Sequence, residues 1–115
     1  MNLFVRFFGT VLALLLATRL IEGFVVESLY AAVIVALILG VINITLKPIV
    51  LLIALPLQIL TLGLFTFIVN AGFLLFVASF VEGFTLAGTF VEQFITALIG
   101  SLLITAVLWI LDIFF

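Results

Sequence analysis

The chain has 115 residues, of which 70% are hydrophobic and 7% are charged, and its three basic and five acidic side chains give a net charge of −2. A soluble domain devotes roughly a quarter of its residues to charge, so the composition indicates an integral membrane protein. The chain also lacks the basic stripe that holds nucleic-acid phosphates, which excludes nucleic-acid binding. Because it contains no Cys and no His, we expect no disulfide, metal or cofactor site.

The charged residues divide the chain into apolar stretches that suit membrane spans of about 20 residues. They are Arg6, Arg19, Glu22, Glu27, Lys47, Glu82, Glu92 and Asp112. The uncharged stretch 48–81 is too long for one span, at roughly 51 Å as a helix, and we expect Pro48 and Pro56 to break it. The sequence therefore predicts an all-α, polytopic single membrane domain over residues 1–115. Its four predicted spans are 2–21, 29–46, 57–81 and 93–113, and a Pro-bounded connector covers 48–58.

The first stretch has two interpretations, because Arg6 and an apolar run also begin a signal peptide. Ala17-Thr18-Arg19 is a poor cleavage site, so we expect an uncleaved first helix whose two arginines reach opposite faces of the membrane. With four spans, Arg6 and Lys47 lie on one side and Arg19 on the other. This bias predicts that both termini are cytoplasmic, although it is small enough to permit insertion in either direction.

A shift of 60 residues aligns the chain with itself, and 14–45 matches 74–105 at eight of 32 positions. The informative matches are Glu22, Gly23 and Phe24 with Glu82, Gly83 and Phe84, and Gly40 with Gly100. The pattern indicates a tandem repeat of a two-helix unit with its symmetry axis along the membrane normal. Chance matching in a leucine-rich chain is the alternative. Both Glu-Gly-Phe segments would form outer turns, with the two phenylalanines at the membrane interface.

Small residues recur along one face of three predicted helices, which lets helix backbones approach closely in lipid. They are Gly9, Ala13 and Ala17; Ala32, Ala36 and Gly40; and Ala97, Gly100, Ser101 and Thr105. Packing within one chain is one interpretation. The other is that at least one face contacts a second protomer, which predicts a homo-oligomer.

Few polar residues lie in the interior of the chain's apolar segments. Asn43 and Asn70 lie at similar distances from the centre of the connector, so they could meet across neighbouring helices. They would form either a helix-to-helix clamp or the polar lining of a narrow pathway. Lys47 is expected to reach anionic lipid headgroups. Since no nucleophile has an evident base, we expect no enzymatic activity and no small-molecule substrate.

Four motifs around the connector resemble one bacterial family, the phage holin family 4 or superfamily IV holins with four spans. They are Asn43-Ile-Thr-Leu-Lys47-Pro48, Leu55-Pro56-Leu57, Thr61-Leu-Gly63-Leu-Phe65, and Asn70. The resemblance implies a multi-pass protein of the bacterial inner, cytoplasmic membrane that contacts the lipid bilayer, oligomerises and permeabilises it. The alternative is a structural protein that forms no pore and organises the cell envelope.

Overall fold

The computed structural model describes residues 2–115. Each of its three long helices begins at a residue whose side chain caps the helix N-terminus. Asn2 accepts a hydrogen bond from the backbone N–H of Val5 at 2.9 Å, and Ser28 accepts one from Ala31 at 3.1 Å. Thr89 and Glu92 form a reciprocal capping box. Each cap satisfies backbone donors that have no partner inside their helix.

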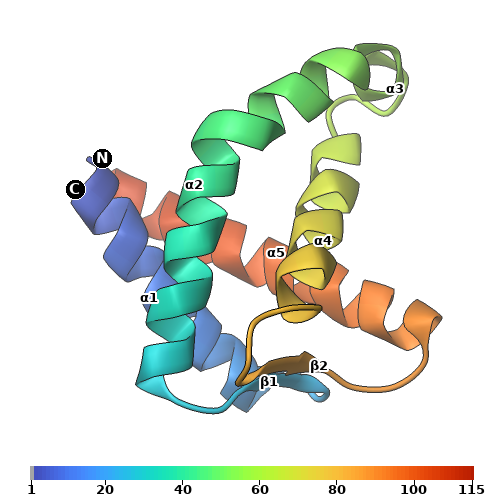
Figure 1. The fold of residues 1–115 in the computed structure, drawn as a ribbon. Coiled ribbons are helices and arrows are strands. Elements are labelled where there is room, and N and C mark those ends of the chain that lie inside the picture. The colour runs from blue at the N-terminus through green and yellow to red at the C-terminus, as the bar shows by residue number, and fades with distance from the viewer. Residues whose placement is uncertain (1) are drawn as a thin grey trace.

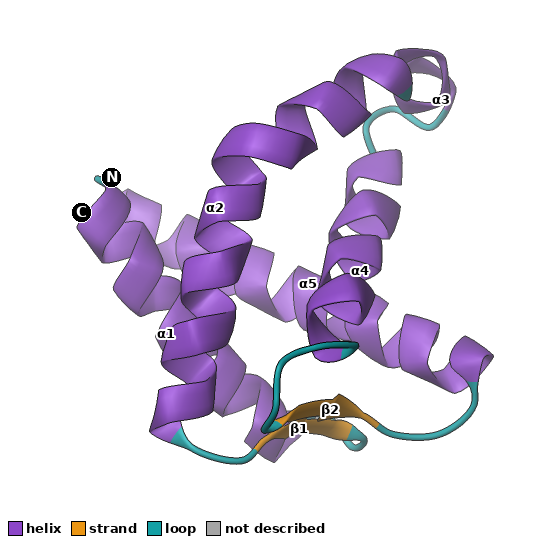
Figure 2. Ribbon diagram, in the orientation of Figure 1, coloured by secondary structure: helices purple, strands orange, loops and turns teal. Residues whose placement is uncertain are grey.

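The chain forms five helices and two strands within the described residues (Figures 1 and 2). In chain order they are α1 (Leu3–Leu20), β1 (Phe24–Val26), α2 (Leu29–Ile53), α3 (Leu55–Leu60), α4 (Phe65–Ala78), β2 (Phe84–Leu86) and α5 (Phe90–Phe114). Three of them, α1, α2 and α5, are long and apolar enough to cross a membrane, and α4 is a shorter apolar helix. The fold is mostly helical, but the all-α expectation missed the two strands.

The region around the two prolines differs from the sequence expectation. Helix α2 does not end at Pro48 but continues through it to Ile53, and Figure 1 shows α2 bending in its second half. Proline removes one backbone hydrogen bond, which a helix can tolerate as a bend. Pro56 lies in the first turn of α3, where its missing N–H costs no helical bond.

The expected span 57–81 is also divided. Leu62 and Gly63 adopt positive φ angles of 55° and 88° between α3 and α4. The Gly63 N–H donates to the Gln58 carbonyl at 2.8 Å, a closure typical of helix C-termini. Helix α4 then has 14 residues, or about 21 Å, which is shorter than the hydrocarbon core of about 30 Å.

The four longer helices form a ring. Helix α1 packs against α2 and α5, and α4 packs against the same two helices. Within residues 2–115, the backbones of the opposite pairs, α1 with α4 and α2 with α5, do not approach within 8 Å from Cα to Cα. The centre of this ring must therefore be filled by other groups or remain hollow.

The paired strands fill one end of the ring. β1 and β2 are antiparallel, with Phe24 opposite Leu86, Val25 opposite Thr85 and Val26 opposite Phe84. Alternate side chains of a strand point to opposite faces, so the central pair is exposed while the outer four residues are buried. The Phe24 and Phe84 rings contact each other, with centroids 5.2 Å apart. We call Phe24, Val26, Phe84 and Leu86 the strand plug.

The order helix, strand, helix occurs twice, in α1–β1–α2 and α4–β2–α5. The strand register places Val25 opposite Thr85, the residue 60 positions later. Residues 21–30 and 81–90 also share the same sequence of buried, half-buried and exposed positions. An axis passing between Val25 and Thr85 would relate the two halves.

Candidate functional site: a polar cavity in the helix ring

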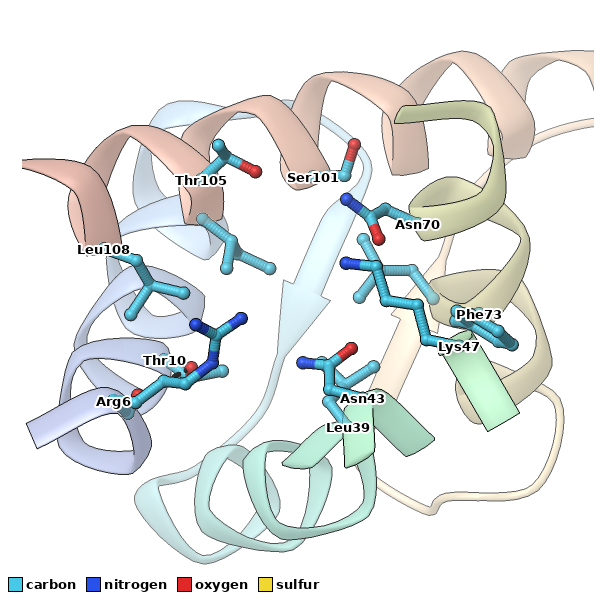
Figure 3. A pocket seen from close by; sticks show the side chains of 12 residues that line it. Arg6, Thr10, Leu39, Asn43, Lys47, Asn70, Phe73, Ser101, Thr105 and Leu108 are labelled. Atoms are coloured by element: carbon cyan, nitrogen blue, oxygen red, sulfur yellow. Dashed lines mark hydrogen bonds between the residues drawn. The ribbon is translucent and has the colours of Figure 1, made fainter. Parts of the chain in front are cut away.

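A polar cavity occupies the ring where the strand plug does not reach. All four helices of the ring contribute to its wall, as Figure 3 shows. The inner part has a volume of about 60 Å³. Its lining comprises Arg6, Thr10, Leu39, Asn43, Lys47, Asn70, Phe73, Leu74, Ser101, Ile104, Thr105 and Leu108.

A wider outer part of about 400 Å³ adjoins the inner part and shares five of its lining residues. The shared residues are Arg6, Lys47, Asn70, Thr105 and Leu108, and Thr66, Phe67, Trp109 and Asp112 complete the outer wall. Arg6 is in the first turns of α1, and Asp112 is near the end of α5. The cavity therefore lies toward the end of the ring where α1 begins and α5 ends, and Gly9 of α1 faces Leu108 and Leu111 of α5 there.

Two hydroxyl groups of the wall are bound to their own helices. The Thr10 hydroxyl donates to the Arg6 carbonyl at 2.8 Å, and the Ser101 hydroxyl donates to the Leu98 carbonyl at 2.9 Å. Both side chains are buried. Their hydroxyl hydrogens are thus satisfied without any group in the cavity.

Four nitrogen-bearing side chains point into the cavity: Arg6, Asn43, Lys47 and Asn70 (Figure 3). Arg6 is exposed and the other three are half-buried. The Arg6 guanidinium and the Lys47 ammonium are close enough for their like charges to interact. The inner wall has no carboxylate among its residues, so its electrostatic potential is positive.

The site residues expected from the sequence divide into those that meet at the cavity and those that do not. Asn43, Lys47 and Asn70 meet there. Lys47 is half-buried and directed into the ring, and its contact with lipid headgroups stays a prediction. The remaining motif residues, Pro48, Pro56, Thr61 and Gly63, do not line the cavity.

Thr61 and Gly63 instead shape the α3–α4 turn. The Thr61 hydroxyl donates to the Leu57 carbonyl at 2.8 Å and accepts from the Phe65 N–H at 3.1 Å. Gln58 is fixed nearby, because its amide donates to the Thr66 hydroxyl at 2.8 Å. These bonds fix the position at which α4 begins, and α4 is the helix that places Asn70 in the ring.

The two Glu-Gly-Phe turns lie at the opposite end from the cavity. Glu22 and Glu82 are exposed, and Gly23 and Gly83 have φ angles of 87° and 89°, a conformation that glycine adopts readily. The expectation that the two phenylalanines of these turns lie at the membrane interface is wrong. Phe24 and Phe84 are each 1% exposed, because strand pairing directs both rings inward.

Most of the small residues expected at helix contacts are buried. These are Gly9, Ala13, Ala17, Ala32, Ala36, Ala97, Gly100 and Ser101. Gly9 faces Leu108 and Leu111 of α5. Gly40 and Thr105 are exposed, and an added Cβ at Gly40 would meet nothing within 4 Å.

Sequence reasoning missed Arg6 and Thr10 as members of the site. In the sequence, Arg6 has the position of a charge that marks the end of a span, and Thr10 is a single polar residue in the first predicted helix. Neither position by itself indicates a site. Their spacing of four residues places both on one helix face, which was the available indication. The pairing of that face with Asn43 and Asn70 depends on how the helices are rotated.

The apolar helices and the polar interior at one end of their ring define a polytopic helical membrane protein. The family described as "Mycobacterial 4 TMS phage holin, superfamily IV" matches residues 1–110. The chain belongs to this family and is a bacterial integral membrane protein, which confirms the resemblance seen in its motifs.

Two relatives extend this comparison. An uncharacterized protein of Streptomyces coelicolor is 41% identical over 88 residues, which cover 76% of this chain and 70% of that protein. An uncharacterized membrane protein of Bacillus subtilis, YvlD, is 38% identical over 68 residues, which cover 59% of this chain and 57% of the relative. No solved structure matches the chain significantly.

Proposed function

We propose that this chain is a holin-like protein that oligomerises laterally in the bacterial cytoplasmic membrane and permeabilises it. The observation that carries the proposal is the polar cavity, which all four helices of the ring line. Polar side chains within a membrane-spanning bundle are costly unless they pair or face water. The cavity would form part of a polar path that begins at the end of the ring where α1 starts and α5 ends.

A single ring does not complete that path, because the strand plug closes its other end. Phe24, Val26, Phe84 and Leu86 are all buried there. Any lesion therefore requires rearrangement of the helices, and we infer that this occurs in an oligomer. Lateral assembly would exchange contacts within one ring for contacts between protomers.

The strand plug also favours the second candidate function, a closed protein that organises lipid or a partner in the envelope. A densely packed plug resists opening, because separating it would expose its apolar side chains. The two functions differ in their effect on the membrane potential. Permeabilisation abolishes the potential, whereas a closed protein leaves it intact.

Regulated expression in cells that carry a potential-sensitive dye distinguishes these functions. A holin-like protein gives sudden depolarisation once its amount in the membrane passes a threshold. A second culture expresses the chain at the same level from the start of growth. It shows whether that amount of protein can accumulate in the membrane while the potential stays intact. Sustained high expression with an intact potential would reject permeabilisation and favour the closed protein.

Orientation and duplication form part of the same proposal. We infer that both termini are cytoplasmic, because Arg6 and Lys47 lie toward one end of the ring and Arg19 toward the strands. We also infer that the chain contains two copies of a helix–strand–helix unit. The strand register and the shared burial pattern of 21–30 and 81–90 support this duplication.

A further inference from the structure

The cavity is rich in hydrogen-bond donors. A guanidinium has five N–H donors, an ammonium has three and each asparagine amide has two, and the two cations have no acceptor. Within residues 2–115, the side chains of Arg6, Asn43, Lys47 and Asn70 form no hydrogen bond or ion pair with one another or with any other described group. These donors converge on one space (Figure 3), which favours a ligand that accepts several hydrogen bonds at once.

The charges define the ligand further. Arg6 and Lys47 repel each other across the cavity, and an anion between them would replace that repulsion with two attractions. Charge-assisted hydrogen bonds to an oxyanion are roughly twice as strong as neutral ones. Asp112, the one carboxylate of the wall, belongs to the outer part, so the inner part is lined by the two cations and the amides without a carboxylate.

We propose that this cavity binds a phosphate group. Arg6 and Lys47 neutralise its charge, and the amides of Asn43 and Asn70 donate hydrogen bonds to its oxygens. The outer part, at about 400 Å³, is within the size range of small-molecule sites. It has room for the rest of a molecule whose phosphate group occupies the inner part. The ligand is either free phosphate or the phosphodiester of an anionic lipid headgroup. The site does not depend on whether the protein permeabilises membranes.

The test uses the full chain in nanodiscs, with the fluorescence of its single Trp as one readout. Trp109 lines the outer part of the cavity, so a ligand that enters changes its environment. In the first arm, nanodiscs of a phosphate-free glycolipid, digalactosyldiacylglycerol, are titrated with inorganic phosphate. In the second arm, phosphatidylglycerol competes with that glycolipid, and retained lipid is measured by native mass spectrometry. A response in the first arm identifies free phosphate as a ligand, and retention in the second alone identifies the lipid headgroup.

Matched variants assign the binding to these residues. We expect Arg6→Gln and Lys47→Gln to weaken binding about tenfold or more, and Lys47→Arg to preserve most of it. Arg19→Gln is the control, because Arg19 is exposed in the last turn of α1 and lines neither part of the cavity. Circular-dichroism melting shows whether each variant is folded.

Two results would overturn the proposal. One is that folded Arg6→Gln and Lys47→Gln bind as tightly as the wild type. The other needs no variant: wild-type protein that neither responds to phosphate nor prefers phosphatidylglycerol has no such site. Sulfate, a similar oxyanion, should displace the ligand from wild-type protein, whereas choline should not.

Discussion

At the scale of single residues, Gly40 and Gly100 show how one sequence pattern leads to two environments. The two glycines lie 60 positions apart, each in a long helix. A Cβ added at Gly100 would lie 2.6 Å from Cε2 of Phe24, whereas one added at Gly40 would meet nothing within 4 Å. Gly100 is therefore the position at which α5 accepts the strand plug.

Substituting Gly100 with Ala should destabilise the fold by about 1–3 kcal/mol, because the added methyl group displaces the Phe24 ring from a packed site. Gly40→Ala is the matched control and should change the free energy of unfolding by less than about 0.5 kcal/mol. Denaturant unfolding in micelles, followed by circular dichroism, measures both. Equal losses in the two variants would show that the ring of Phe24 is not seated on Gly100.

The burial of Phe24 and Phe84 could not be read from the sequence. An aromatic residue after Glu-Gly at the end of a span is typical of the membrane interface. The inward direction of the two rings results from strand pairing between segments about 60 residues apart. No local pattern contains that information, because the strands have three residues each.

At the scale of elements, α2 carries the clearest difference between sequence and structure. Pro48 was expected to end the helix, because it removes a backbone donor and clashes with the preceding turn. The helix continues for five residues beyond it, to Ile53. In the apolar stretch that follows, few side chains can replace helical hydrogen bonds, so continuing the helix satisfies most backbone groups.

The exposed face of α2 includes Gly40 and is where we expect protomers to meet. Gly40→Leu should reduce association without affecting the fold, because the new side chain enters open space within the chain. Gly72→Leu on α4 is the matched control, since Gly72 is also exposed and open. Energy transfer between protomers labelled at Phe115→Cys in vesicles should fall for Gly40→Leu alone.

The same pair of variants links assembly to function. If oligomers permeabilise the membrane, Gly40→Leu should also raise the expression level at which cells depolarise, and Gly72→Leu should not. Unchanged energy transfer in Gly40→Leu, with normal expression, would remove this face of α2 from the proposed assembly.

At the scale of the whole molecule, the ring has two chemically different ends. The strand plug and the exposed Glu22 and Glu82 lie at one end. The cavity with Arg6 and Lys47 lies toward the other, near both termini. This polarity allows the orientation in the membrane to be tested with labels at two positions.

A cysteine at either end tests the orientation cleanly, because the chain has no Cys of its own. In intact cells, a membrane-impermeant maleimide should modify Glu82→Cys but modify Phe115→Cys only after the cells are permeabilised. Glu22→Cys, in the equivalent turn of the first half, should behave as Glu82→Cys does. The reverse pattern would invert the orientation, and labelling of all three in cells that keep their membrane potential would indicate insertion in both directions.

Sequence by itself determined the membrane environment, the mostly helical character of the fold and the family. Scarce charges at intervals of about a span place the chain in lipid, because a charged side chain is costly in hydrocarbon and is therefore kept out of the middle of spans. The Asn43-to-Pro48 motif and its neighbours identified the family. These conclusions need only residues that are close together in the chain.

Only the tertiary structure decided what occupies the centre of the ring. Helix rotation brings Arg6 and Thr10 to the same space as Asn43, Lys47 and Asn70, and strand pairing places the plug at the other end. Both results depend on contacts between segments far apart in sequence, which periodicity and spacing do not encode. The sequence predicted that Asn43 and Asn70 lie within the membrane, and the packing of four helices places them in one cavity with Arg6, Thr10 and Lys47.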